Sequence, residues 1–282
     1  MRSHILIYSL IVFLLTISTA GADGSGSEYR LHDGHIHYDQ DVWDALTPAE
    51  AIQMLTSQNI QRALVSATPT QGAEMLYRED PEVVIPMLRP YKSWRHRYLW
   101  FKDPELKTYL QEHLSRVPYR GFGEFHIFGQ DVDSPPVDEM IMLARERNLA
   151  LHPHIDLEGM RILLGKARDI PVLWAHGGFN VPVDVLRDML DEYPELYIEL
   201  SLREGMLDAE DQLMPHWKAV LIKYRKRFLV GMDTYKPSRW ASLPEIAAET
   251  RHWLGQLPED VAEDIARNNM DDLFPKKQRG EI

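Results

Sequence analysis

The stretch Asp33-Gly34-His35-Ile36-His37 ends a short run of alternating apolar and polar residues, 29–36, which predicts a β-strand. Residues two apart on a strand point to the same face, so Asp33, His35 and His37 share one face. The two imidazoles then converge just beyond the end of the strand, where they can bind one metal ion. An isolated His-x-His is a weak signal, and its meaning depends on the residues that accompany it.

The rest of the chain alternates short apolar runs with longer segments of helical period. Strands are predicted at 29–37, 62–67, 83–89, 121–128, 149–155, 172–176, 196–202 and 228–233. Most are apolar almost throughout, which is typical of parallel strands covered on both faces. Eight β-then-α units in about 250 residues predict a single α/β domain with the (β/α)8, or TIM-barrel, fold over residues 29–275.

Several of the intervening helices have recognisable start signals. Thr47 is followed by Pro48 and by Glu50, which is the arrangement of a capping box with proline at the first helical position. Asp103-Pro104 repeats the acidic cap and proline, and Ser134-Pro135 is a looser version. Further helices are expected near 157–168, 182–192, 209–227, 243–254 and 260–273.

An open, doubly wound sheet would show the same alternation of strands and helices. That fold needs a glycine-rich turn after its first strand, where the backbone approaches a phosphate, and the sequence has none there. The polar residues instead favour the barrel.

Ionisable residues recur at the carboxyl ends of the predicted strands, where a (β/α)8 barrel has its active site. They are His35 and His37 on the first strand, Glu124 and His126 on the fourth, His152 and His154 on the fifth, His176 on the sixth and Asp233 on the eighth. Burying this many imidazoles and carboxylates without a cation would be costly. The pattern therefore predicts a metal site.

Composition limits the chemistry and the partners. The chain has no cysteine, so catalysis must use imidazole, carboxylate or metal-bound water, and no disulfide can form. The formal net charge of −12 argues against nucleic acid or an anionic membrane surface as a partner. A small-molecule substrate is expected.

The first 28 residues are not expected to belong to the fold. Arg2 precedes an apolar run, 5–17, and Ala20-Gly21-Ala22 resembles an A-x-A cleavage site, so residues 1–22 predict a signal peptide. Residues 23–28 are interpreted as a flexible leader, and 276–282 as a C-terminal tail. The mature protein is expected to be exported, periplasmic or secreted, with no membrane association after cleavage; an uncleaved N-terminal anchor is the alternative.

These residues, in the order in which they follow one another along the chain, resemble the amidohydrolase superfamily, specifically its amidohydrolase-related branch of compact metal-dependent barrels. Besides the first motif, the resemblance is carried by Gly123-Glu124-Phe125-His126, His176-Gly177-Gly178, Gly231-Met232-Asp233-Thr234, and residues 265–269 near Leu273-Phe274. It runs in order over nearly the whole predicted mature chain.

The resemblance implies that His35 and His37 bind the more buried metal ion, with Asp233 completing that site and acting as the base. His176 and the strand-five histidine would bind a second ion. Asp233 and His176 are accordingly the predicted catalytic residues. Glu124 stands where many relatives have a carboxylated lysine that bridges two metals, which leaves one ion or two as open alternatives.

Four further side chains, His152, His126, Arg89 and Arg203, are predicted to support the ligands or to bind the substrate. Of the two strand-five histidines, His154 lies nearer the strand's end and is the favoured ligand, while His152 would support the ligands or substitute for one. His126 would orient a ligand or contact the substrate. Arg89 and Arg203 follow strands three and seven, and are the basic groups best placed to bind an anionic substrate.

The predicted cofactor is a divalent metal, most simply zinc, with manganese or iron as alternatives. Such an ion lowers the pKa of bound water to about 7. The sequence thus predicts a metal-dependent hydrolase that uses metal-activated water on an amide, ester or lactone of a small molecule. A non-oxidative decarboxylase of the same branch, and a non-catalytic metal- or ligand-binding barrel, are the alternatives.

Overall fold

The computed structural model describes residues 29–276. The predicted signal peptide and leader, and all but the first residue of the predicted C-terminal tail, lie outside the described residues. Within residues 29–276, no helix is long and apolar enough to cross a membrane.

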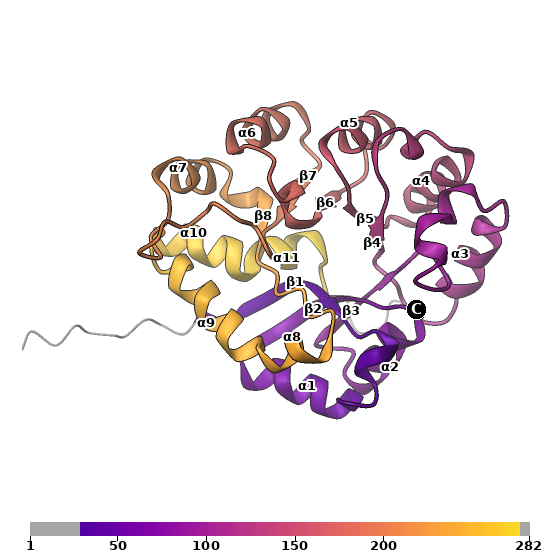
Figure 1. Cartoon of the computed structure of the whole chain (residues 1–282), viewed down its shortest axis with the longest axis horizontal. Coiled ribbons are helices and arrows are strands. Elements are labelled where there is room, and N and C mark those ends of the chain that lie inside the picture. Colours follow the sequence, from indigo (N-terminus) through magenta and orange to yellow (C-terminus); the bar gives the residue numbers. More distant parts are fainter. Residues whose placement is uncertain (1–28, 277–282) are drawn as a thin grey trace, which may run out of the picture.

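Eight parallel strands form one sheet in chain order (Figure 1). They are β1 Leu31–His37, β2 Ile60–Ser66, β3 Val84–Leu88, β4 Gly121–His126, β5 Ala150–His154, β6 Val172–Trp174, β7 Leu196–Glu199 and β8 Phe228–Leu229. The sheet closes where the chain after β8 meets β1: Ile36 and Thr234 form a parallel bridge, and the Gly34 N–H donates to the Val230 carbonyl at 2.9 Å. The predicted (β/α)8 barrel is confirmed.

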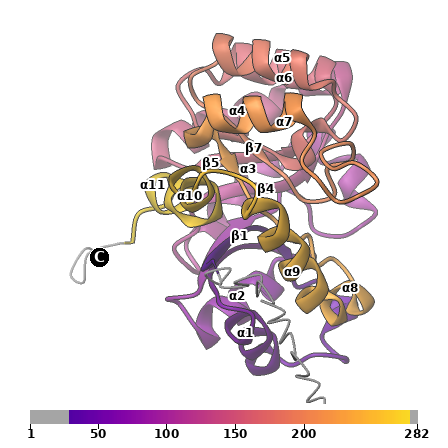
Figure 2. The same ribbon diagram turned by 90° about the vertical axis from the view of Figure 1, so that its left-hand side faces the viewer.

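Helices surround the strands and cover their outer faces (Figure 1). They are α1 Pro48–Ser57, α2 Gln71–Glu79, α3 Leu106–Leu114, α4 Pro135–Arg147, α5 Leu157–Lys166, α6 Val183–Glu192, α7 Pro215–Lys223, α8 Pro237–Ala241, α9 Leu243–Leu254, α10 Glu259–Glu263 and α11 Asn269–Leu273. Figure 2 shows α5 and α6 at one extreme of the molecule and α1 and α2 at the other, with the strands between them.

Two helix starts predicted from the sequence are confirmed. At α1, the Thr47 hydroxyl accepts from the Glu50 N–H while the Glu50 carboxylate accepts from the Thr47 N–H, so the capping box is present. The α4 helix begins at Pro135, directly after Ser134.

Two other predicted helices begin later than expected, because a carboxylate stabilises a turn instead of capping a helix. Asp103 accepts from the Glu105 N–H at 2.9 Å, and α3 starts only at Leu106. Asp208 accepts from the N–H groups of Glu210 and Gln212, so the residues from 209 to 214 form a turn and α7 starts at Pro215. The helix α2, for which the sequence shows no start signal, begins without a side-chain cap.

The two ends of the barrel interior are filled differently, and the clustered imidazoles and carboxylates lie at one of them. Towards the amino ends of the strands it is filled by an apolar cluster that α11 and the residue after it help to close: Leu64, Ile85, Met87, Ala150, Leu173, Leu229, Met270 and Phe274. This packed plug leaves the carboxyl ends of the strands as the place where a site can form.

Gly72 allows the loop after β1 to pack against α2. A Cβ there would lie 2.0 Å from the Tyr38 carbonyl oxygen and 2.8 Å from the Ala67 Cβ, whereas a Cβ on Gly165 of α5 would meet nothing within 4 Å. We expect Gly72→Ala to lower the free energy of unfolding by about 1–3 kcal/mol through overpacking. Gly165→Ala, the matched control, should raise it by about 0.5–1 kcal/mol through backbone entropy. Urea denaturation measures both, and equal stabilities would contradict the packing argument.

Candidate metal centre

Six of the side chains predicted at strand ends converge at the carboxyl end of the barrel. They are His35, His37, Glu124, His154, His176 and Asp233, and all except the partly exposed His154 are buried. They come from five different strands or from the residues directly after them.

One half of the cluster joins β1 to the end of β8. The Nε2 atoms of His35 and His37 are 3.0 Å apart, and Asp233 Oδ1 lies 3.6 Å from the first and 3.2 Å from the second. These three atoms form a group compact enough to hold one metal ion. Imidazole nitrogen and carboxylate oxygen are the donors that zinc and similar divalent ions take in proteins.

The outer nitrogens of these imidazoles face hydrogen-bond acceptors. His35 Nδ1 lies 2.8 Å from Glu199 Oε2, and His37 Nδ1 lies 2.9 Å from Ser66 Oγ. If each Nδ1 carries the proton and donates it to these oxygens, each Nε2 keeps its lone pair for a metal ion. Metal-binding histidines are commonly fixed in this way.

The other half of the cluster is built around Glu124. Its Oε1 lies 2.8 Å from His154 Nδ1 and 3.6 Å from His176 Nε2, while its Oε2 lies 3.2 Å from His37 Nε2. Because Oε1 also lies 3.5 Å from His35 Nε2, this carboxylate adjoins both halves of the cluster. His176 Nδ1 lies 3.0 Å from both the hydroxyl and the carbonyl oxygen of Ser201, so this imidazole is oriented like the first two.

Two of the converging residues have left-handed backbone conformations. His176 has φ 58° and Asp233 has φ 48°, and neither is a glycine. Such conformations cost free energy in a non-glycine residue and concentrate at functional sites. The Asp233 N–H donates to the His35 carbonyl oxygen at 2.7 Å, which holds its backbone in place.

The carboxylates set the electrostatics of the cluster. Burial alone would lower the pKa of His35, but Asp233, Glu124 and Glu199 outweigh it and hold the pKa well above the usual value. Burial would raise the pKa of Glu124 and of Asp233, yet the surrounding imidazoles hold both pKa values well below their usual range. Carboxylates that stabilise a proton on His35 would also stabilise a divalent cation. The six side chains therefore suit a metal ion in their charge as well as in their donor atoms.

Arg89 lies beneath the cluster, fully buried. It donates to Asp39 Oδ1 at 3.0 Å and to the Glu124 carbonyl oxygen at 3.1 Å, and its Nη2 lies 2.8 Å from His37 Nδ1. Of the two tautomers of His37, only the one that donates from Nδ1 to Ser66 leaves Nε2 free for a metal ion. The structure therefore places Arg89 as a support for the cluster, with no exposed surface to offer an anionic substrate.

The remaining predicted residues lie around the cluster. His152 is buried below it, with its ring 4.7 Å from that of His35 and its Nε2 unpartnered among the described residues. His126 stacks on His154 at 4.2 Å, and its Nδ1 lies 3.2 Å from the Tyr91 hydroxyl. Arg203 donates to the carbonyl oxygens of Gly177 and Val181, and so ties down the loop that follows His176.

Glu199 is the main site residue that the sequence reasoning missed. It is fully buried, and although burial raises its pKa, His35 and His176 lower it further, to about 2. Its signal was a single carboxylate within the apolar run predicted as strand seven. Ser66 and Ser201, which orient His37 and His176, have no comparable signal in the sequence.

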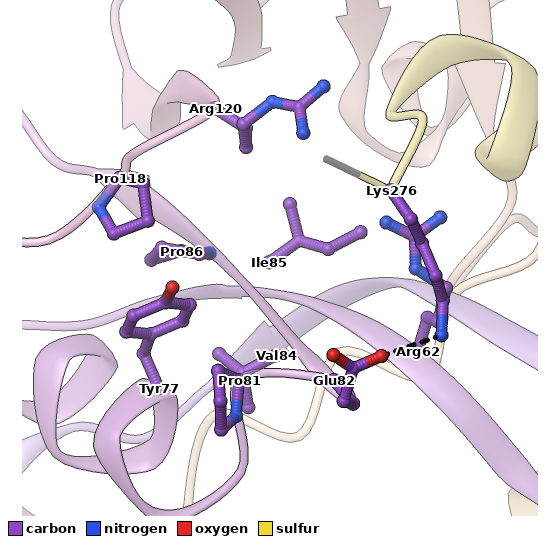
Figure 3. Close-up of a pocket in the computed structure, with 10 residues that line it drawn as sticks. All are labelled: Arg62, Tyr77, Pro81, Glu82, Val84, Ile85, Pro86, Pro118, Arg120 and Lys276. Carbon is purple, nitrogen blue, oxygen red and sulfur yellow. Dashed lines mark hydrogen bonds and ion pairs between the residues drawn. The ribbon is translucent and has the colours of Figure 1, made fainter. Parts of the chain in front are cut away.

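A separate cavity of about 350 Å³ lies near the amino-terminal ends of β2, β3 and β4, away from these side chains (Figure 3). Arg62, Arg120 and Lys276 line it with prolines and other apolar side chains, but none of the six converging residues does. The six residues of the candidate metal centre therefore lie outside this cavity.

Fold and site together define a (β/α)8 barrel with a candidate metal centre at its carboxyl mouth. No family model and no curated protein matches the sequence. Solved structures do share the fold, among them members of the amidohydrolase superfamily, as the sequence resemblance implied.

Three of these structures show the extent of the likeness. An amidohydrolase from Burkholderia multivorans with bound zinc is 13% identical, with 86% of this chain and 98% of that chain covered and a TM-score of 0.57. A probable 2-pyrone-4,6-dicarboxylic acid hydrolase from Acinetobacter baumannii with citric acid bound is 13% identical, with 87% and 99% covered and a TM-score of 0.59. A TatD homologue from Escherichia coli is 16% identical, with 89% and 100% covered and a TM-score of 0.63. At these identities the likeness is one of fold.

Glu199 accepts from four donors: His35 Nδ1, Ser201 Oγ, and the backbone N–H groups of His176 and Ser201. In Glu199→Gln, the amide NH2 would face one of these donors, and His35 would lose its fixed orientation. We expect zinc affinity to fall about 10- to 100-fold, as measured by competition with a chromogenic chelator. Glu195→Gln, at a residue in the loop before β7, is the matched control, and an unchanged affinity in Glu199→Gln would refute the role of Glu199.

Proposed function

We propose that the protein is a metal-dependent hydrolase of the amidohydrolase type, with its active site at the carboxyl mouth of the barrel. The observation that carries this proposal is the compact group of His35, His37 and Asp233. The Nδ1 of His35 faces the Glu199 carboxylate, and the Nδ1 of His37 lies between Ser66 Oγ at 2.9 Å and the donor Arg89 Nη2 at 2.8 Å. Donation from His37 Nδ1 to Ser66 Oγ leaves Nε2 free for an ion.

The proposed ligands divide into two sets. His35, His37 and Asp233 form one compact group and would hold one ion. His154 and His176 would hold a second ion through Glu124, which forms one compact group with His126 and His154 and another with His35 and His176. Zinc fits these donors, and manganese or iron would also be accepted. A bound divalent ion would polarise the substrate carbonyl and make water a better nucleophile.

Asp233 is the proposed general base. Its carboxylate is buried, and its lowered pKa keeps it ionised at neutral pH, as a base must be. A lowered pKa also weakens it as a base, and a bound metal ion would offset this by lowering the pKa of the attacking water. After accepting the proton of the attacking water, it would deliver that proton to the leaving group. The backbone of Asp233 is held by its N–H, which donates to the His35 carbonyl oxygen at 2.7 Å.

The proposed substrate is a small molecule with an amide, ester or lactone bond. Structures with the same fold are described as an amidohydrolase with zinc bound and as a probable 2-pyrone-4,6-dicarboxylic acid hydrolase with citric acid bound, which supports hydrolysis and a small substrate.

We also propose that the protein is exported and that residues 1–22 are removed. The apolar run 5–17 and the A-x-A pattern before Asp23 support this. The intact mass of the protein recovered from its host should place the first residue near Asp23. A full-length chain in the membrane fraction would instead show an uncleaved anchor.

Replacing Asp233 tests the mechanism. Asp233→Asn keeps an oxygen at the ligand position but removes the base, so we expect kcat to fall about 10²- to 10⁴-fold while the metal content stays the same. Turnover of an amide, ester and lactone panel, with metal analysis of the same samples, measures both. Asp184→Asn, at an exposed residue of α6, is the control and should match the wild type.

Three outcomes would contradict the proposal. Unchanged turnover in Asp233→Asn would exclude this residue as the base. One ion per chain together with release of carbon dioxide would indicate a decarboxylase. A metal-loaded wild-type protein that converts no member of the panel would favour a binding barrel.

A further inference from the structure

Exposed apolar side chains gather at the mouth of the barrel. Within residues 29–276, eight large apolar side chains are exposed, and six of them follow β3, β4, β7 or β8: Trp94, Tyr98, Leu99, Phe128, Leu202 and Tyr235. The other two, Met142 and Ile222, lie on the outer helices α4 and α7. Apolar surface concentrated around a polar site indicates a contact with an apolar ligand or partner.

Two aromatic side chains lie directly against the proposed ligands. The ring of Phe179 lies 4.2 Å from that of His176 and 5.0 Å from that of His154. The ring of Phe128 lies edge-on to His154 at 6.0 Å, and 48% of this side chain is exposed. Phe179 has φ 54°, an unfavourable conformation for an aromatic residue, so its ring is held there at a cost.

Trp94 borders the cluster from the β1 and β3 side. Its ring lies between two guanidinium groups, 5.2 Å from Arg89 and 4.7 Å from Arg97. Arg89 itself contacts His37 and Glu124. Two cation–π contacts fix the indole, although 40% of Trp94 remains exposed.

We propose that the substrate carries a planar apolar group, such as a phenyl ring, next to the bond that is hydrolysed, and that Phe128 and Phe179 bind this group. The inference rests on the proposed function, because it assigns a substrate class to that site. These two rings come from different loops, and both adjoin His154, whereas Trp94 adjoins Arg89 and is not part of this pair. Because Phe179 is already packed against two imidazoles, binding a flat group there costs little ordering of the protein.

The test compares two esters that differ only in the acyl group, methyl benzoate and methyl acetate, with the metal-loaded protein. In Phe128→Ala we expect kcat/KM for the benzoate to fall about 3- to 10-fold, with the acetate changed less than about 2-fold. Phe128→Tyr keeps the ring and should restore the benzoate value. Met142→Ala is the matched control, because Met142 is as exposed as Phe128, at 47%, but lies on α4.

A second readout does not depend on activity. Saturation-transfer NMR on the metal-free protein should show binding of benzamide but not of acetamide, and Phe128→Ala should weaken the benzamide signal. Equal losses for both esters, or benzamide binding that Phe128→Ala leaves unchanged, would overturn the inference. If no member of the amide, ester and lactone panel is hydrolysed while benzamide binding depends on Phe128, the proposed function fails and the assignment of the aromatic site stands.

Discussion

One of the hydrogen bonds that close the barrel also brings two of the proposed ligands together. The Asp233 N–H donates to the His35 carbonyl oxygen at 2.7 Å, where the last strand returns to the first. Asp33 reinforces this seam, since its Oδ1 accepts from the N–H groups of His35 and Met232 at 3.0 Å each. The residues that complete the sheet are therefore those that carry or adjoin the proposed ligands. When the barrel closes, it therefore also brings Asp233 close to His37.

The buried carboxylates around this closure fall into two groups, according to the groups that neutralise them. Asp39 is neutralised by Arg89, and Glu199 accepts from His35, so these two carboxylates have partners within the protein. Glu124 and Asp233 have only imidazoles as close counter-charges, apart from the longer contact of 3.4 Å between Arg89 and Glu124. These two are the carboxylates that a metal ion would neutralise.

The sequence alone predicted those parts of the structure that repeat or that follow a fixed period. Eight apolar runs at regular spacing predicted the barrel, and the period of two along each strand predicted that His35 and His37 share a face. Glu199 could not be found in this way, because its partner His35 lies on the far end of the chain and becomes a neighbour only when the barrel closes. The late start of α3 could not be predicted for a different reason. Asp103 is equally suited to a turn and to a helix cap, and the local sequence does not distinguish the two.

The two ends of the barrel interior differ in a way that bears on the chemistry. Met270 and Phe274 seal the amino end with apolar side chains, so water and substrate must enter from the carboxyl end. A buried, sealed cluster strengthens every electrostatic interaction among Glu124, Asp233 and the imidazoles, because little solvent screens it. The same sealing means that any substrate group beyond the reacting bond must lie in the mouth, against the loops that follow the strands. Under the proposed function, polar ligands below aromatic side chains would favour substrates that are polar at the reacting bond and apolar beside it.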